Sequence, residues 1–390
     1  MLIENEADKL LMIPGPTPVH HDILAALAQP TIAHTSQVLA DLINDALDGL
    51  RLTAGTSAAP VFVFAGSGTL AQEAALVNLV APGERVLVAS NGYFGDRFVE
   101  MAQAHGIDAT RLAAPWGESI TAEQLRAALT NGQYRAVTIT QVDTSTGTAA
   151  PVAALAEAAR SSGALVILDS VCALGGMPVD MDSLGLDLVL TGAQKALGVP
   201  PGLAILAVSE RAMERRRSIG RISSYYTDLL RWEASMQDPR TYFSTHAVNH
   251  FYALHAALDI VRREGLSQRI ARHLHLASAF RAGTGALGFV PFTQHQYLAP
   301  TLSVLAYPPG VEDEPFRVAL AERGVVAAGC LGEFKGKGVR FGHMGNIGPA
   351  DILQTMGAVE SSLAAIGAEV KPGAGLAAVE QILLQGAATP

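Results

Sequence analysis

The sequence has few of the features that mark membrane, secreted or nucleic-acid-binding proteins. It contains 2 cysteines among 390 residues and no Cys-x-x-Cys, so it offers neither a disulfide framework nor a metal knuckle. No apolar run reaches the roughly 18 residues that a membrane span needs. The N-terminus is acidic where a secretory signal would be basic, and the net charge of -9 gives no nucleic-acid footprint. We therefore expect a cytoplasmic protein that binds neither membranes nor nucleic acids.

Charged residues are also scarce, at 16% of the chain, whereas hydrophobic residues make up 49%. This composition is typical of a well-buried globular protein, and the length suits two domains. The one compact basic run, Arg215 to Arg217, is interpreted as a solvated helix face, because cations are favourable near the C-terminal end of a helix. The histidines at 250, 255, 273 and 275 are interpreted as core or solvated side chains, and we expect no metal site.

Short apolar runs alternate with helical segments through the first two thirds of the chain. Strands covered on both faces read as continuous apolar runs, so this alternation predicts an α/β fold with a mostly parallel sheet. A different pattern follows, with two long helices and then a smaller α/β unit. We expect an N-terminal loop segment over 1–20, a large domain over 21–265 and a small C-terminal domain over 266–390. The predicted strands are 59–64, 85–90, 135–142, 164–169, 187–191, 202–208, 300–307, 325–328 and 339–343, and the predicted helices are 69–80, 94–105, 151–162, 246–263 and 267–287.

Three short motifs stand at the ends of predicted strands. Ser67-Gly68-Thr69 opens a helix, where free N–H groups and the helix dipole favour an anion, although a plain strand-to-helix turn fits too. Asp169 ends a very apolar strand and is either a buried functional carboxylate or a helix cap. Lys195 follows an apolar strand and is either a desolvated nucleophile or a lysine that extends to solvent. Together they supply a phosphate cup, an acidic partner and a Schiff-base lysine, which are the requirements of pyridoxal 5'-phosphate (PLP).

The order of motifs resembles the class V branch of the fold-type I PLP-dependent transferases. The motifs are GSGT, DTSTG, LDSV, GAQKAL and VRFGHMG, and the opening IPGPTP is also similar. The most similar members are the alanine–glyoxylate and serine–pyruvate aminotransferases. The resemblance covers nearly the whole chain, and it implies an enzyme that transfers an amino group from alanine or serine to glyoxylate or pyruvate by a ping-pong mechanism.

The resemblance also implies a role for individual residues. Lys195 is the catalytic lysine and Asp169 the partner of the pyridine nitrogen. Arg340 is expected to bind the substrate carboxylate, since a planar guanidinium suits a bidentate contact. The implied cofactor contacts are Ser67, Gly68, Thr69, Phe94, Thr144, Asp169, Val171, Gln194, Lys195, Tyr242 and Thr245. Tyr242 and Thr245 match a pair that reaches the neighbouring subunit, so the resemblance implies a homodimer with a shared active site.

Two departures from the family pattern affect these expectations. Many relatives have His-Arg-Ser where this chain has His34-Thr35-Ser36, so any substrate contact of that arginine is absent. Phe94 stands where many relatives have tryptophan or tyrosine. Pyridoxamine–pyruvate, ureidoglycine–glyoxylate and aminoethylphosphonate aminotransferases share the same motifs and remain alternatives. A cysteine desulfurase or related lyase is a further alternative, although Gln194 replaces the histidine that usually precedes the lysine. A PLP-binding module without activity and an unrelated α/β protein are the remaining alternatives.

Overall fold

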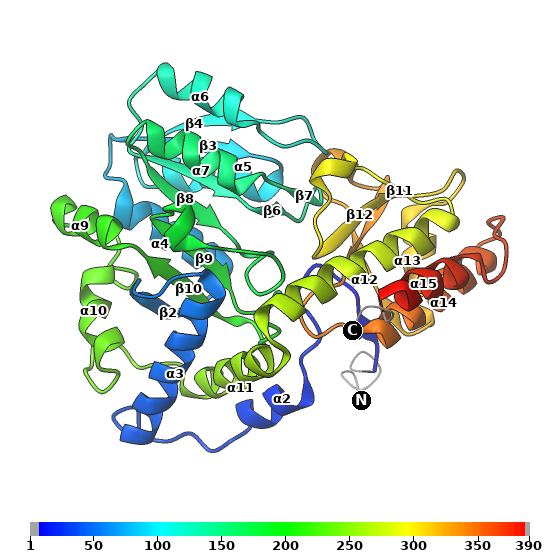
Figure 1. The fold of residues 1–390 in the computed structure, drawn as a ribbon, viewed down its shortest axis with the longest axis horizontal. Coiled ribbons are helices and arrows are strands. Elements are labelled where there is room, and N and C mark those ends of the chain that lie inside the picture. Colours follow the sequence, from blue (N-terminus) through cyan, green and yellow to red (C-terminus); the bar gives the residue numbers. More distant parts are fainter. Residues whose placement is uncertain (1–7, 387–390) are drawn as a thin grey trace.

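A seven-stranded sheet forms the centre of the larger part of the protein in the computed structural model (Figure 1). All its strands are parallel except β10, which is antiparallel to both neighbours. The mostly parallel sheet predicted from the sequence is therefore confirmed. In spatial order the strands are β2 (Val61–Gly66), β10 (Gly202–Val208), β9 (Leu188–Gly192), β8 (Leu165–Asp169), β5 (Ala136–Thr140), β3 (Arg85–Ser90) and β4 (Asp108–Ala113).

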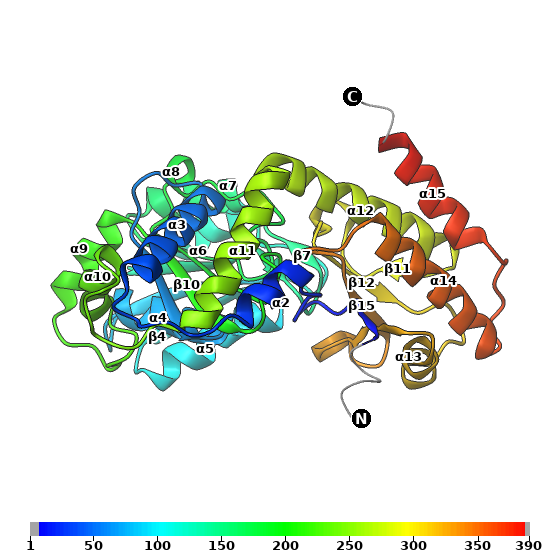
Figure 2. The same ribbon diagram turned by 90° about the horizontal axis from the view of Figure 1, so that it is seen from below.

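The structure describes residues 8–386; residues 1–7 of the predicted N-terminal segment and 387–390 of the predicted C-terminal domain lie outside this range. Helices α4 (Gly68–Leu79) and α5 (Tyr93–Ala104) cover one face of the sheet, and α3 (Gln37–Ala54) and α7 (Val152–Ser161) lie on the other (Figure 2). Because both faces are covered, the central strands are buried along their whole length, as their apolar sequences require. Shorter helices complete this part: α2 (His21–Leu27), α6 (Ala122–Thr130), α8 (Met181–Leu184), α9 (Glu210–Ile219) and α10 (Leu229–Gln237).

The two long helices α11 (Val248–Glu264) and α12 (Leu266–Ala286) meet at Gly265, whose φ of 82° permits the sharp change of direction. Beyond them, an antiparallel sheet and three helices bury a second core that includes Phe280, Phe316 and Phe341. The strands of this sheet, in spatial order, are β11 (Val290–Pro291), β12 (Leu302–Ala306), β15 (Gly338–Gly342) and β14 (Ala328–Gly329). The helices are α13 (Asp313–Glu322), α14 (Pro349–Ala365) and α15 (Ala374–Gly386). No helix in the described range is both long and apolar enough to cross a membrane.

The N-terminal segment does not belong to one part alone. Strand β1 (Leu10–Leu11) pairs with β13 (Val325–Val326), and Met12 is buried in the second core. The single strand predicted over 325–328 is therefore two short strands, β13 against β1 and β14 within the antiparallel sheet. The domain boundaries at residues 20 and 265 stay predictions.

One prediction about the surface is wrong. Arg216 is 1% exposed, although the run from Arg215 to Arg217 is predicted to be a solvated helix face. Its guanidinium forms an ion pair with Asp228 at 2.8 Å and also donates to the Gly220 carbonyl. A partner 12 positions along the chain neutralises this arginine, and the sequence pattern of one helix carries no information about such a partner.

Candidate active site

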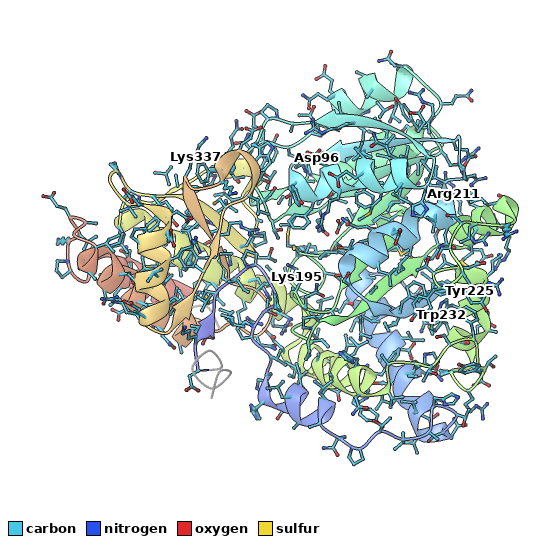
Figure 3. All side chains as sticks on the ribbon, turned by 180° about the vertical axis from the view of Figure 1, so that it is seen from behind. Asp96, Lys195, Arg211, Tyr225, Trp232 and Lys337 are labelled. Carbon is cyan, nitrogen blue, oxygen red and sulfur yellow. The ribbon has the colours of Figure 1, made fainter. Side chains whose placement is uncertain are left out.

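The carboxyl ends of the parallel strands meet at the junction between the two parts of the protein, where Figure 3 shows Lys195. Ligands of open α/β sheets bind at this edge, because the loops that follow the strands converge there. A cavity of about 170 Å³ opens at this place. Its lining consists of Ser67, Gly68, Thr69, Gln72, Phe94, Arg97, Val142, Thr144, Asp169, Val171, Cys172, Gln194 and Lys195. Nine residues predicted from the sequence are in this lining, namely Ser67, Gly68, Thr69, Phe94, Thr144, Asp169, Val171, Gln194 and Lys195.

Asp169 is the last residue of β8 and is 3% exposed. One carboxylate oxygen accepts from the Val171 amide at 2.9 Å, and the other accepts from the Gln72 side chain at 2.7 Å. Burial raises the pKa of Asp169 to about 6, and these two hydrogen bonds oppose the rise. No cation of the described residues lies within salt-bridge distance of this carboxylate. The site therefore holds an acid that a cationic group of a bound molecule could pair with.

Lys195 lies on the loop that follows β9, and the N-terminal segment covers it. Its Nζ donates to the Pro14 carbonyl oxygen, and the Thr17 hydroxyl donates to the Lys195 carbonyl at 2.9 Å. Gly15 has a φ of 107°, and a Cβ built there would lie 2.6 Å from Lys195 Nζ. Only glycine fits between this loop and the lysine. The opening loop predicted from the sequence therefore contributes directly to the environment of the amino group.

Helix α4 begins at the edge of the cavity, and its first turn has free donors. Ser67 occupies the N-cap position but its side chain makes no capping hydrogen bond. The Gln194 side-chain oxygen is buried and has no hydrogen-bond partner in the described part of the chain. Gly192 allows this approach, because a Cβ there would lie 2.8 Å from that oxygen and 3.0 Å from the Gly68 nitrogen. The free N–H groups at this helix N-terminus are suited to an anion, and the Gln194 amide beside them can turn its NH₂ group toward one.

Phe94 is held at the start of α5 by a buried acid that the sequence interpretation did not single out. One oxygen of Asp143 accepts from the Phe94 and Gly95 amides at 2.9 and 3.0 Å. The other accepts from the amide and hydroxyl of Ser145. Val171 lies close enough to Gly68 that a Cβ on the glycine would be 3.0 Å from its methyl carbon. Asp143 thus fixes the aromatic residue that faces the cavity.

Arg340 lies on β15 of the smaller part and is held beside the cavity rather than in its lining. Its Nε donates to the Gly329 carbonyl at 2.8 Å and its Nη1 to the Thr144 carbonyl at 3.3 Å. Burial lowers the pKa of its guanidinium, and no carboxylate of the described residues forms a salt bridge with it. The hydrogen bond to Thr144 places this cation next to a residue that lines the cavity.

Tyr242 and Thr245 do not lie in the cavity of their own chain. Tyr242 is 64% exposed and contacts His34, with ring centroids 5.5 Å apart. Phe243, beside it, contacts Tyr225, which is well separated from Lys195 in Figure 3. The predicted role of Tyr242 and Thr245 in a neighbouring subunit is compatible with this exposure and stays a prediction.

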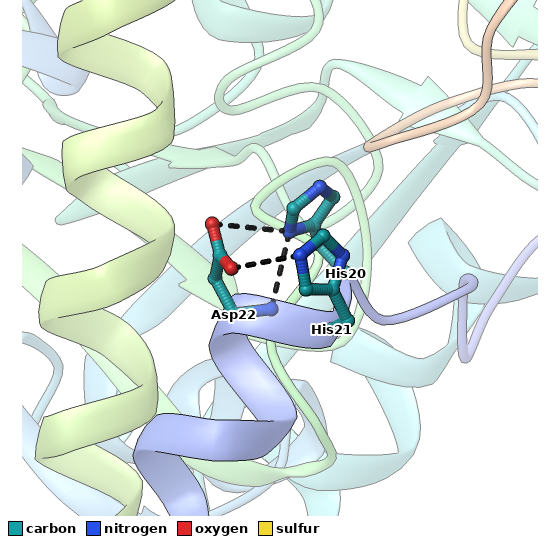
Figure 4. Close-up of side chains that lie close together, drawn as sticks. All are labelled: His20, His21 and Asp22. Atoms are coloured by element: carbon teal, nitrogen blue, oxygen red, sulfur yellow. Dashed lines mark hydrogen bonds and ion pairs between the residues drawn. The ribbon is translucent and has the colours of Figure 1, made fainter.

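Two groups of histidine and acid side chains lie outside the cavity. His20, His21 and Asp22 gather at the start of α2 (Figure 4), where His20 Nδ1 accepts from the Asp22 amide as the helix cap. Asp45 and Asp259, beside His255, both pair with Arg262, at 2.8 and 2.6 Å. Capping and ion pairing account for both groups. His273, by contrast, is fully buried and bonded to the Arg269 carbonyl and the Gly345 amide, as a core histidine should be.

These features fit PLP. A buried carboxylate that forms no salt bridge with the described residues suits a pyridinium nitrogen, a lysine amino group suits an aldehyde, and free donors at a helix N-terminus suit a phosphate. The glycines at 15 and 192 let the chain pack closely against Lys195 and the start of α4, where a side chain would clash. The fold and the site together define a PLP-dependent enzyme of fold type I.

The comparisons with known proteins identify the family. The model of the family Aminotransferase class-V matches residues 21–329. An uncharacterised aminotransferase from Methanocaldococcus jannaschii is 37% identical over 97% of this chain and 98% of that protein. The L-aspartate–glyoxylate aminotransferase of Paracoccus denitrificans is 33% identical over 95% of each chain. The chain therefore belongs to the class-V aminotransferases, and it is a PLP-dependent aminotransferase.

The solved structures agree with this assignment. Ureidoglycine–glyoxylate aminotransferase from Bacillus subtilis superposes with a TM-score of 0.93 at 28% identity, over 96% of this chain and 98% of that chain. A cysteine desulfurase from Thermococcus onnurineus has a TM-score of 0.72 at 11% identity, which shows a shared fold alone. The resemblance inferred from the motifs is confirmed.

Two residues of the site were missed from the sequence. Gln72 and Asp143 both act through contacts with residues that are distant in the chain. The sequence held a weak indication of Gln72, because it is a polar residue in a largely apolar helix. In the structure its side chain is 3% exposed. A buried polar side chain needs a partner, so it points to a site.

Proposed function

We propose that this enzyme moves the amino group of a small amino acid, alanine or serine, to glyoxylate or pyruvate. The observation that carries the proposal is that Lys195 and Asp169 line one cavity, while Arg340 lies beside it, bonded to the lining residue Thr144, as the cation for the substrate carboxylate. Val142 and Cys172, both small or apolar, also belong to the lining of the cavity. Relatives named serine–glyoxylate and alanine–glyoxylate aminotransferases, at 29% and 32% identity, support this substrate class.

The roles of the chain's own residues follow from their positions. Bound PLP supplies an aldehyde carbon and an electron sink, so bonds at the α-carbon of a linked amino acid are weakened. The buried carboxylate of Asp169 would stabilise the protonated form of the pyridine nitrogen. Lys195 Nζ would move the proton from the donor α-carbon to the cofactor carbon that carried the aldehyde, and Arg340 would orient the substrate carboxylate. The phosphate would be held by Ser67, Gly68, Thr69 and Gln194, and the ring would be contacted by Phe94, Val171 and Thr144.

We also propose that two chains complete each site. In this arrangement Tyr242 and Thr245 of one protomer reach the phosphate of its partner. Their exposure in the single chain, and that of Ser67 and Thr69, supports the proposal, since both surfaces are free to meet. The two cysteines, which are buried and free, support a cytoplasmic location.

The test is a visible absorption spectrum of the purified enzyme with PLP and then with candidate donors. We expect alanine or serine to abolish the band of the lysine-linked cofactor and glyoxylate to restore it, because the two half-reactions are separate. A band that responds only to aspartate, pyridoxamine, ureidoglycine or aminoethylphosphonate would replace our donor class with that one. Absence of a band after incubation with PLP would contradict the cofactor sites assigned to this chain.

A further inference from the structure

Arg97 lines the cavity, but none of the proposed cofactor or substrate contacts involves it. It lies on α5, three residues after Phe94, so the two side chains share one face of the helix. Its guanidinium carbon is 5.2 Å from the Phe94 ring centroid and 5.4 Å from that of Tyr93. Its Nη1 donates to the Thr69 hydroxyl at 3.3 Å. The guanidinium therefore lies between the aromatic residue and the first turn of α4.

No carboxylate in the described range neutralises this arginine. Asp96, its neighbour in the chain, pairs instead with Arg111 at 2.5 and 3.0 Å. Arg340, the other guanidinium of the site, is engaged by the carbonyls of Gly329 and Thr144. A half-buried arginine without an acidic partner, facing a cavity, is suited to an anionic ligand.

The phosphate cup assigned from the sequence contains no charged residue. Ser67, Thr69 and Gln194 offer neutral donors, and the helix dipole contributes only about half an elementary charge. Tyr242 and Thr245, proposed to come from the partner, are neutral as well. A phosphate monoester carries up to two negative charges, which lose solvation in a cavity. A cation beside the cup would offset this loss of solvation.

We propose that Arg97 is the charge partner of the cofactor phosphate. The guanidinium already bonds to the Thr69 hydroxyl, so a phosphate oxygen that accepts from this hydroxyl lies next to it. A guanidinium donates to two phosphate oxygens at once, and its flat face remains on the Phe94 ring. This role rests on the proposed phosphate cup and adds to it a residue that sets how tightly the phosphorylated cofactor is held.

Two other roles for Arg97 must be distinguished from this one. It could only support the Phe94 ring, in which case the phosphate is irrelevant. It could also contact a second carboxylate on a substrate such as aspartate. The three roles differ in what they recognise, namely a phosphate, an aromatic ring or a substrate, so binding measurements separate them.

The experiment titrates the cofactor-free enzyme with PLP and, separately, with pyridoxal, which has the same ring and aldehyde without the phosphate. Binding is followed by absorbance of the lysine-linked form, which needs no turnover. The variants are Arg97→Gln and Arg97→Lys, with Arg126→Gln as the matched control, because Arg126 is 52% exposed on α6 with one partner at 3.9 Å.

We expect Arg97→Gln to weaken PLP binding about 10- to 100-fold, as for a lost charge-assisted hydrogen bond, and to change pyridoxal binding by less than about twofold. Arg97→Lys should recover most of the affinity, and Arg126→Gln should match the wild type. Equal losses for both compounds would mean that Arg97 only supports the ring. Unchanged PLP affinity with a raised KM for aspartate would mean a substrate contact; either result overturns the proposal. If the wild-type protein binds neither compound, the cofactor site itself is wrong.

Discussion

The buried carboxylate of Asp169 is expected to lower the stability of the cofactor-free protein at neutral pH and to raise that of the cofactor-bound protein. Burial raises its pKa from 3.8 to about 6. A difference of about two pKa units corresponds to roughly 3 kcal/mol, because one unit is worth about 1.4 kcal/mol. The folded protein binds this proton more tightly than the unfolded chain does. The contribution to stability is therefore present below the unfolded pKa and is lost as the pH rises through the folded pKa.

The change to make is Asp169→Asn. Asparagine accepts from Gln72 as the acid does, but its NH₂ group cannot accept from the Val171 amide, which costs about 1–3 kcal/mol at every pH. The variant has no charge to bury, so it lacks the pH-dependent loss. From about pH 4.5 to about pH 7.5 the stability of the variant should improve relative to the wild type by about 2 kcal/mol.

Urea unfolding of the cofactor-free wild type and variant at both pH values measures this change. Asp48→Asn, at a side chain 72% exposed, controls for the removal of one negative charge. With PLP bound, the variant should be less stable than the wild type at pH 7.5, because it cannot pair with a pyridinium nitrogen, and its PLP affinity should fall at least about tenfold. The same pH dependence in variant and wild type would refute the argument that burial of Asp169 destabilises the cofactor-free protein.

Other residues give predictions of the same kind. Lys195→Ala should reduce turnover by about 10⁴-fold or more in a steady-state assay, since it removes the acid–base group; a wild-type rate would exclude Lys195. Arg340→Ala should raise KM for donor and acceptor about 10-fold or more, and unchanged constants would remove it from the site. Glu264→Gln leaves Arg269, 1% exposed, without its 2.8 Å partner, and should cost about 3 kcal/mol in urea unfolding; a loss below about 0.5 would contradict a buried pair. Gly15→Ala should weaken PLP binding, because its Cβ meets Lys195; unchanged affinity would show that the loop moves aside.

The bounds of the central strands could be predicted closely, because short, continuous apolar runs between helices indicate strands that are buried on both faces. Arg85–Ser90 has the predicted bounds, and Leu165–Asp169 differs by one residue. Strand β4 was missed because it lies at the sheet edge, where polar residues in DATRLA remain half-exposed. No element before residue 59 was predicted either, although α3 is an amphipathic helix of 18 residues. Edge positions and outer helices depend on which neighbour covers them, which a local pattern does not reveal.

The location of the cofactor contacts at the strand ends could also be predicted from the sequence. Asp169 ends one apolar strand and Lys195 follows its neighbour, and the ends of parallel strands meet at one edge. Gln72, Asp143 and Arg97 could not be placed in this way. Gln72 contacts Asp169 across 97 positions, and Asp143 contacts Phe94 across 49. Each is an ordinary polar residue until folding brings its partner to it.

The sequence by itself determined the class of fold, the chemistry and the family, because apolar runs, turn residues and motifs act over short stretches of chain. Only the tertiary structure decided how the charges are arranged. Within residues 8–386 it left neither Asp169 nor Arg97 a salt-bridge partner at the cavity, paired buried Arg216 with Asp228, and put the N-terminal loop over Lys195. The free energy of a charge depends on what surrounds it in space, and that environment is assembled from distant parts of the chain.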